Sequence, residues 1–417
     1  MRNKLFKNIG FLTLSQVANY LLPLVTIPYV TRIVGPENFG LIEFAQSTLL
    51  YLIVLVNFGF NRTATRQIAA NPNNMVLVSR VFSEVVTAKL VLFIASFVIM
   101  IISIILVPKF WEHSFILLVG FPIVLGWAIY PSFLFEGLQK LEVNALADVL
   151  IKLLAAVLIL TLITKRDQYY MVPLINGIMQ VVFGGLILWY ALIKVDGLKF
   201  LWPSKNEVMT QIGEAKYVFF SSFFTTLYNF STIMFGAFLL SPIQLGIYAA
   251  ASKLIYVANS FLYKPLLGAF YPYLAAKMAE SLSAFKQVFS KGLLYLGIVS
   301  ALGSIVIFVF ARFIIQIVFG SSYLDGIDIL KIMAPTLFIG SFIHMYLHQG
   351  ILQLKKDKQY MILITIGGIL SLILNYVFIS KYQLTGAALV KIVVDVFLAL
   401  VSGVYFYRQF TIRKLMG

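Results

Sequence analysis

Long apolar runs follow one another along this chain and limit what it can fold into. About twelve runs are each long enough for a transmembrane helix, which needs about 20 mostly apolar residues. They are continuous, whereas β-barrel strands alternate polar and apolar positions over about ten residues. The runs lie at residues 9–33, 40–61, 81–107, 114–136, 144–164, 169–193, 215–240, 245–270, 290–319, 327–353, 360–380 and 385–407. We therefore expect an all-α polytopic membrane protein.

The composition excludes most soluble functions. Hydrophobic residues make up 61% of the chain and charged residues 12%, against about 45–50% and about 25% in soluble domains. The chain has no cysteine, which excludes disulfides, thiolate catalysis and cysteine-ligated metals. No P-loop pattern occurs, so we do not expect the chain to hydrolyse ATP. His344 and His348 are one turn apart but lack a nearby carboxylate in their run, so neither a metal nor another cofactor is expected.

The basic residues predict the orientation of the chain. The formal net charge is +16, but the basic residues form short clusters between apolar runs, so a nucleic acid partner is not expected. One set of alternate loops holds Arg2, Lys4, Lys7, Arg62, Arg66, Arg80, Lys140, Lys194, Lys199, Lys205, Lys216, Lys277, Lys286, Lys291, Lys355, Lys356, Lys358, Arg408, Arg413 and Lys414. The other set holds Arg32, Lys109, Lys165, Arg166 and Lys381. The positive-inside rule then places both termini in the cytoplasm.

The two halves of the sequence resemble each other at an offset of 206 residues. Residues 36–41 and 242–247 share a pattern of Pro, two further residues, an apolar residue, Gly and an apolar residue. The offset corresponds to six whole spans. Because six is an even number, both halves have the same orientation in the membrane. We therefore predict two six-helix lobes, residues 1–205 and 206–417, related by a pseudo-twofold axis along the membrane normal.

Several basic and polar residues within or beside the spans are candidate substrate ligands. Lys253 and Lys264 lie on one face of the eighth span with Tyr256 between them, and no acidic residue occurs between Gln244 and Glu280. This stripe favours an anionic ligand with a sugar part, although lysine snorkelling remains an alternative. Arg62 and Arg66 are spaced to clamp phosphate oxygens or to act as a positive-inside anchor. The predicted substrate-binding set is Lys253, Lys264, Arg62, Arg66, Arg32, Tyr256, Asn19 and Asn57.

Buried carboxylates are candidates for ion coupling. Glu43, Glu84 and Asp148 lie within spans, where a charge is costly and commonly functional. Structural pairing is the alternative for each of them. The i,i+4 spacing of Asp148 and Lys152, and that of Lys391 and Asp395, also predict ion pairs, each on one helix face.

Four segments carry recognisable motifs: residues 28–40, 57–69, 246–254 and 386–389, of which residues 57–69 read Asn-Phe-Gly-Phe-Asn-Arg-Thr-Ala-Thr-Arg-Gln-Ile-Ala. They resemble the bacterial O-antigen and polysaccharide repeat-unit flippases, members of the multidrug/oligosaccharidyl-lipid/polysaccharide exporter superfamily. Lys253 occupies the position of a cavity arginine in related lipid-II flippases. The resemblance implies two bundles in a V shape, in a bacterial cytoplasmic membrane, working by alternating access.

The resemblance also implies a cargo and partners. The cargo would be an undecaprenyl-diphosphate-linked oligosaccharide moved from the inner to the outer leaflet, with no enzymatic step. Membrane lipid, a polysaccharide polymerase and a chain-length regulator are the implied partners. Two alternatives stay open: an ion-coupled multidrug exporter, and a membrane-embedded polymerase or acyltransferase. The exporter usually needs buried carboxylates, and the enzyme needs larger outer loops than this sequence has.

Overall fold

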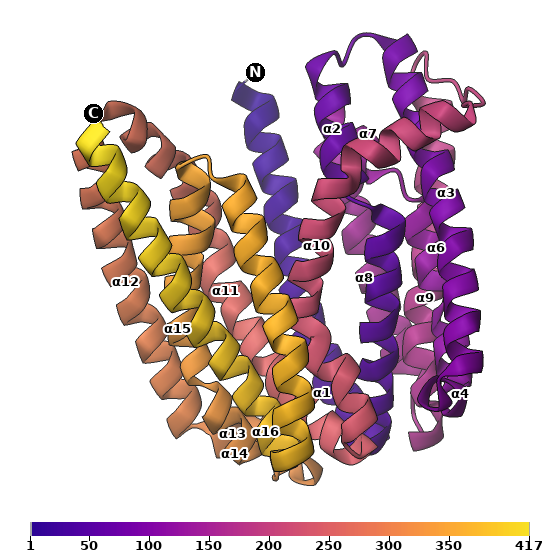
Figure 1. The fold of residues 1–417 in the computed structure, drawn as a ribbon. Coiled ribbons are helices and arrows are strands. Elements are labelled where there is room, and N and C mark those ends of the chain that lie inside the picture. The colour runs from indigo at the N-terminus through magenta and orange to yellow at the C-terminus, as the bar shows by residue number, and fades with distance from the viewer. Residues whose placement is uncertain (1, 417) are drawn as a thin grey trace. The chain divides into compact units, whose positions relative to one another are not determined.

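The computed structural model describes the backbone of residues 2–416 and the side chains of residues 21–263 and 270–411. Helices account for nearly all of this part of the chain, which contains no strand (Figure 1). The all-α prediction is confirmed. The helices are α1 (Arg2–Asn57), α2 (Phe60–Ala70), α3 (Met75–Leu106), α4 (Pro108–Glu112), α5 (Ser114–Gly120), α6 (Pro122–Ile129), α7 (Ser132–Gly137), α8 (Leu141–Leu162), η1 (Arg166–Tyr170), α9 (Met171–Lys194), α10 (Lys205–Leu239), α11 (Pro242–Glu280), α12 (Leu282–Val309), α13 (Ala311–Val318), η2 (Ser321–Tyr323), α14 (Gly326–Met333), α15 (Pro335–Ile343), η3 (His344–Ile351) and α16 (Asp357–Met416).

Ten helical stretches in the described residues are long and apolar enough to cross a membrane. The longest two, Leu21–Ala70 over α1 and α2 and Asp357–Thr411 in α16, are more than twice the length that one crossing needs. The helices α1 and α16 each contain one residue with non-helical backbone angles, Gly35 and Gln383. Each therefore consists of two consecutive helices, and the whole set is consistent with twelve crossings.

The break in α1 depends on a glycine. Gly35 has φ 76°, in the left-handed region that glycine adopts without a Cβ clash, and Pro36 then begins the next helix. The break packs against the first residue of η1. Arg166 Nη2 donates to Glu37 Oε2 at 2.9 Å, and Asn38 Nδ2 donates to the Arg166 carbonyl at 2.9 Å. These bonds fix the turn between the first and second spans.

The second half makes the corresponding turn with a capped helix start. Ser241 precedes Pro242, and its side chain accepts a hydrogen bond from the Gln244 backbone in a capping box. Ser241 lies 206 residues after Gly35. The sequence repeat thus marks the same structural event in both halves, a helix break followed by proline at the first helical position.

The repeat continues, but its offset changes along the chain. The fourth span of the first half ends at Gln139 and the fourth span of the second half ends at Lys355. Both are non-glycine residues with positive φ, 55° and 57°. Lys140 N donates to the Phe135 carbonyl, and Lys356 N donates to the Ile351 carbonyl. The two ends therefore have the same hydrogen-bonding pattern at an offset of 216 residues, because the connections before them differ in length.

The fourth spans are broken, although each apolar run suggests one continuous helix. Residues 114–137 form α5, α6 and α7, with Pro122 at the start of α6 and Pro131 before α7. Residues 326–351 form α14, α15 and the π-helix η3, with Pro335 at the start of α15. Proline removes a backbone donor and clashes with the preceding turn.

The chain divides into two compact units, residues 1–223 and 224–417. The first has a buried core that includes Phe82, Phe133 and Phe135, and the second has one that includes Phe285 and Phe289. The boundary between the units falls inside α10. The boundary expected from the repeat, between residues 205 and 206, falls at the first turn of the same helix.

Each part of α10 is fixed to its own unit. In the first unit, the Phe219 ring stacks on Phe58 with 4.3 Å between centroids. In the second unit, Ser231 Oγ lies 2.7 Å from Ser371 Oγ, and Asn375 Nδ2 donates to Ser231 Oγ. Packing and polar contacts, rather than the loop, therefore set where the units divide.

Candidate substrate and coupling sites

Lys253 lies in the apolar part of α11, in the second unit. It is 11 residues beyond Pro242, or about 16 Å along the helix, which is about halfway across a hydrocarbon layer about 30 Å thick. Its side chain is half-buried, and Tyr256 one turn later is 53% exposed. Lys264, the second lysine of the predicted stripe, lies outside the described side chains. The described part of the stripe can therefore present a cation and an aromatic ring at mid-membrane depth.

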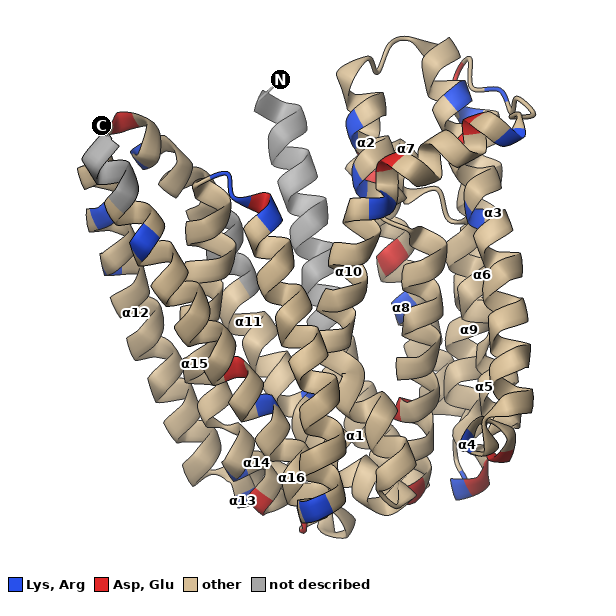
Figure 2. Ribbon diagram, viewed as in Figure 1, with Lys and Arg blue, Asp and Glu red and all other residues tan. Residues whose placement is uncertain are grey.

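The predicted residues of the first unit fall at two levels. Arg62 and Arg66 are exposed on α2, where Figure 2 shows basic residues, and Asn57 ends α1 beside them. Arg32 is exposed just before the break at Gly35. The helix from residue 36 to residue 57 separates these levels by about 32 Å. Arg32 and the α2 arginines therefore cannot hold one diphosphate at the same time.

Asn57 differs from the arginines of the predicted set because one of its polar atoms is buried and unsatisfied. Its Oδ1 is buried and has no hydrogen-bond partner among the described residues. Tyr51 OH and Asn61 Oδ1, one or two turns away, share this property. Asn19, from the same predicted set, lies outside the described side chains.

The three predicted coupling carboxylates lie on three different helices. Glu43 on α1 is 8% exposed and Glu84 on α3 is 6% exposed. Asp148 on α8 is half-buried and close enough to interact electrostatically with Glu136 and Tyr130. The structure gives Glu84 a specific partner, since its Oε2 accepts a hydrogen bond of 2.7 Å from Gln211 Nε2.

Gln211 connects Glu84 to a wider polar network. Gln211 Oε1 accepts from Gln67 Nε2, which also donates to Glu214 Oε2 at 2.7 Å. The network links α2, α3 and the first turns of α10 within the first unit. Such a network can hold the start of α10 in place.

The predicted pair of Lys391 and Asp395 is confirmed. Lys391 Nζ lies 2.9 Å from Asp395 Oδ1. Tyr228 on α10 completes the cluster, because its hydroxyl donates to Asp395 and accepts from Lys391 Nζ at 3.0 Å. The ammonium also lies over the Tyr228 ring, 4.2 Å from its centroid. Asp395 is only 3% exposed, which makes it a coupling candidate that the sequence analysis omitted.

In both units, a side chain on the third span forms hydrogen bonds with backbone groups at the break in the fourth span. Lys89 on α3 is 1% exposed, and its Nζ donates to the Tyr130 carbonyl at 3.0 Å, directly before Pro131. In the second unit, Ser304 on α12 donates to the Ala334 carbonyl at 2.9 Å and accepts from Phe338 N at 3.1 Å. In a continuous helix Phe338 N would donate to the Ala334 carbonyl itself.

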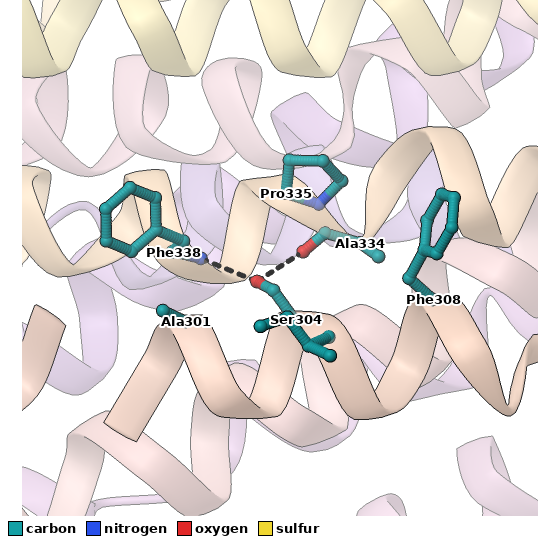
Figure 3. Close-up of a pocket in the computed structure, with 7 residues that line it drawn as sticks. Ala301, Ser304, Phe308, Ala334, Pro335 and Phe338 are labelled. Carbon is teal, nitrogen blue, oxygen red and sulfur yellow. Dashed lines mark hydrogen bonds between the residues drawn. The ribbon is translucent and has the colours of Figure 1, made fainter. Parts of the chain in front are cut away.

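Figure 3 shows this inserted hydroxyl beside a hollow in the second unit. The hollow has a volume of about 280 Å³ and is lined by Ala301, Ser304, Ile305, Phe308, Ala334, Pro335 and Phe338. Apart from Ser304, whose hydroxyl is engaged by backbone, the lining is apolar. The hollow is suited to contact with lipid chains and contributes no charged ligand for a substrate.

Comparison with known proteins identifies the family. A family described as "Polysaccharide biosynthesis protein" matches residues 5–278. A protein of Escherichia coli (strain K12), described as an O-antigen transporter, is 28% identical over 388 residues, which cover 92% of each chain. A Shigella dysenteriae protein with the same description is 25% identical over 304 residues, covering 70% of this chain and 75% of the relative.

The fold has solved counterparts. An inward-facing multidrug resistance MATE family transporter of the MOP superfamily aligns with a TM-score of 0.78, 15% sequence identity, and coverage of 98% of this chain and 99% of that chain. At this identity the likeness shows the fold alone. The family match covers well over half of the chain and agrees with the motifs described above. The chain therefore belongs to the polysaccharide biosynthesis protein family, and it is a multi-pass helical membrane protein with the MATE-like fold of the MOP superfamily.

Proposed function

We propose that this protein moves an undecaprenyl-diphosphate-linked oligosaccharide from the inner to the outer leaflet of a bacterial cytoplasmic membrane. The observation that carries the proposal is the similarity to a relative described as an O-antigen transporter, which extends over 92% of both chains. We further propose alternating access as the mechanism, with both termini in the cytoplasm.

The headgroup sets the chemical problem for such a carrier. Two phosphates and several hydroxyls lose their hydration in hydrocarbon unless protein groups replace it. Lys253 supports the proposal because it puts a cation about halfway along its span. Tyr256, with half of its surface exposed, offers a ring face for a sugar. The prenyl chain needs no polar path and stays in lipid.

The levels of the arginines suggest an order of contacts. In this proposal Arg62 and Arg66 meet the diphosphate at the cytoplasmic leaflet, Lys253 holds it at mid-membrane depth, and Arg32 meets it at the outer leaflet. The separation of about 32 Å between Arg32 and α2 supports successive rather than simultaneous contacts. The two arginines on α2, one turn apart, suit phosphate oxygens in a bidentate arrangement.

A reconstituted transport assay tests this function. Proteoliposomes would contain the full chain and a fluorescent undecaprenyl-diphosphate-linked trisaccharide, and a membrane-impermeant reductant would report the fraction in the outer leaflet. We expect accelerated exchange of this lipid and no accumulation of a cationic dye such as ethidium under an ion gradient. Dye accumulation without lipid exchange would instead identify a multidrug exporter.

A further inference from the structure

The most exposed large apolar side chain in the described residues is Trp202, which is 89% exposed. It lies in the segment between α9 and α10, in the first unit. We propose that Phe200, Leu201 and Trp202 form a membrane anchor that inserts among anionic phospholipid headgroups. This inference does not depend on the identity of the cargo or on the orientation of the chain.

Backbone hydrogen bonds hold the segment against α3 in one conformation. Lys199 N donates to Ser79 Oγ at 3.0 Å, and Leu201 N donates to Ser83 Oγ at 2.8 Å. Ser79 and Ser83 are one turn apart on α3, so two successive turns of one helix align the segment. A flexible loop would hide its apolar side chains, whereas this segment presents them rigidly.

Aromatic contacts fix the direction of Trp202. The Phe200 ring meets Phe82 edge-to-face at 6.4 Å and meets Trp202 edge-to-face at 5.3 Å. The helix that follows is also fixed, because Ser204 N donates to Glu207 Oε2 at 2.7 Å while Glu207 N donates to Ser204 Oγ. Trp202 is therefore held outward by its surroundings on both sides.

The length of α3 places this segment at the level of the headgroups. Its continuous series of exposed apolar side chains extends from Leu90 to Leu106, or about 24 Å. A hydrocarbon layer of about 30 Å centred on that band ends about 3 Å before Leu90. Ser83 lies about 10 Å before Leu90 along the helix, and so about 7 Å outside the hydrocarbon. Tryptophan is enriched at this depth because its ring is amphipathic.

The charges beside Trp202 favour anionic lipid over a neutral surface. Lys194, Lys199, Lys205 and Arg80 are exposed around the segment. Two acidic residues, Asp196 and Glu207, lie among them, so the four cations and two carboxylates leave a net charge of +2. The remaining positive charge attracts phosphatidylglycerol or another anionic headgroup. An apolar tip flanked by lysines is the usual arrangement of an interfacial anchor.

Tryptophan fluorescence in lipid tests the proposal. The chain has four tryptophans, so W111F/W127F/W189F leaves Trp202 as the sole emitter. This variant would be reconstituted in nanodiscs of phosphatidylcholine with or without phosphatidylglycerol, each lipid brominated near the headgroup in turn. We expect strong quenching by brominated lipid, weak quenching by aqueous iodide, and at least a twofold preference for brominated phosphatidylglycerol. W111F/W189F/W202F, which keeps Trp127 within α6, is the matched control for a tryptophan inside a span.

Each possible result decides the proposal. Quenching by iodide and not by brominated lipid would place Trp202 in water and overturn it. Protection from both quenchers would mean that protein covers Trp202, which also overturns it. If brominated phosphatidylcholine and brominated phosphatidylglycerol quench Trp202 equally, and K199Q/K205Q does not change this quenching, the proposed role of charge is overturned. If the triple variant does not fold, a spin label at Leu201→Cys in the natural cysteine-free chain measures the same depth by oxygen and nickel-chelate collision rates.

Discussion

Lys391 and Asp395 form a buried ion pair, 2.9 Å apart, one turn from each other on α16. The aspartate side chain is 4% exposed and the lysine side chain 20% exposed, so neither charge is well hydrated. Tyr228 from α10 contacts both groups. The cluster thus joins the first and last spans of the second unit, and its stability depends on both charges being present.

Removing only the lysine should destabilise the protein more than removing both charges. A buried charge left without its partner costs about 3–5 kcal/mol, whereas replacing a pair by apolar residues is often neutral. We expect K391M to unfold at a clearly lower temperature than K391M/D395L, measured by thermal denaturation of purified protein in detergent. Equal melting temperatures for the single and double variants would contradict a paired Asp395.

Ser304 should matter because its hydroxyl replaces a helical hydrogen bond. In S304A, Phe338 N would lose its acceptor in a lipid-facing region, at a cost of about 1–3 kcal/mol. S96A is the matched control, because the buried Ser96 hydroxyl only donates to the Leu92 carbonyl of its own helix. We expect S304A and not S96A to lower the melting temperature. A loss of the same size in both variants would show that the bridge to α15 has no special role.

The topology can be measured directly because the chain has no cysteine. Ser204, just before α10, and Ser321, the first residue of η2, are both exposed, and we predict that Ser204 is cytoplasmic and Ser321 external. An impermeant maleimide added to intact cells should label S321C and leave S204C unlabelled until the cells are opened. Labelling of S204C in intact cells would reverse the predicted orientation.

Glu43, Glu84 and Asp148 remain predicted coupling groups. If one of them carries the coupling ion, its amide variant (E43Q, E84Q or D148N) should abolish gradient-driven transport at an unchanged protein level. Glu84 has a built-in control in Q211L, which removes its 2.7 Å hydrogen-bond donor but keeps the carboxylate. Transport lost in both E84Q and Q211L would indicate a structural network. Full transport in all three amide variants would exclude the set.

The sequence predicts those features that depend on local pattern. The pair of Lys391 and Asp395 was readable because the residues are four apart on one helix. The break at Gly35 falls in the gap between the apolar runs 9–33 and 40–61, where the sequence predicts a turn between two spans. The repeat was visible at this turn but changes its offset further along, since loops of different length intervene.

Features that depend on distant residues could not be predicted. Tyr228 is 167 residues from Asp395, and no periodicity in either segment indicates their contact. The breaks in the fourth spans are stable because Lys89 and Ser304 satisfy backbone groups from another helix. In the sequence, Lys89 appears only as a costly charge within a span, and Ser304 as a small polar residue.

Lys253 provides the sharpest test of the proposed transport. In our proposal its ammonium contacts the cargo diphosphate, and a hydrogen bond to a charged group contributes about 1.5–3 kcal/mol. K253A should therefore slow export by about ten- to 150-fold while the protein still folds, because the side chain is only half-buried. K253R should retain most activity, since it keeps the charge. K253E should retain none, because like charges repel. Export would be measured with the fluorescent lipid in proteoliposomes, with melting temperature and expression level as controls. Normal export by K253E at a normal expression level would show that Lys253 is not a phosphate ligand.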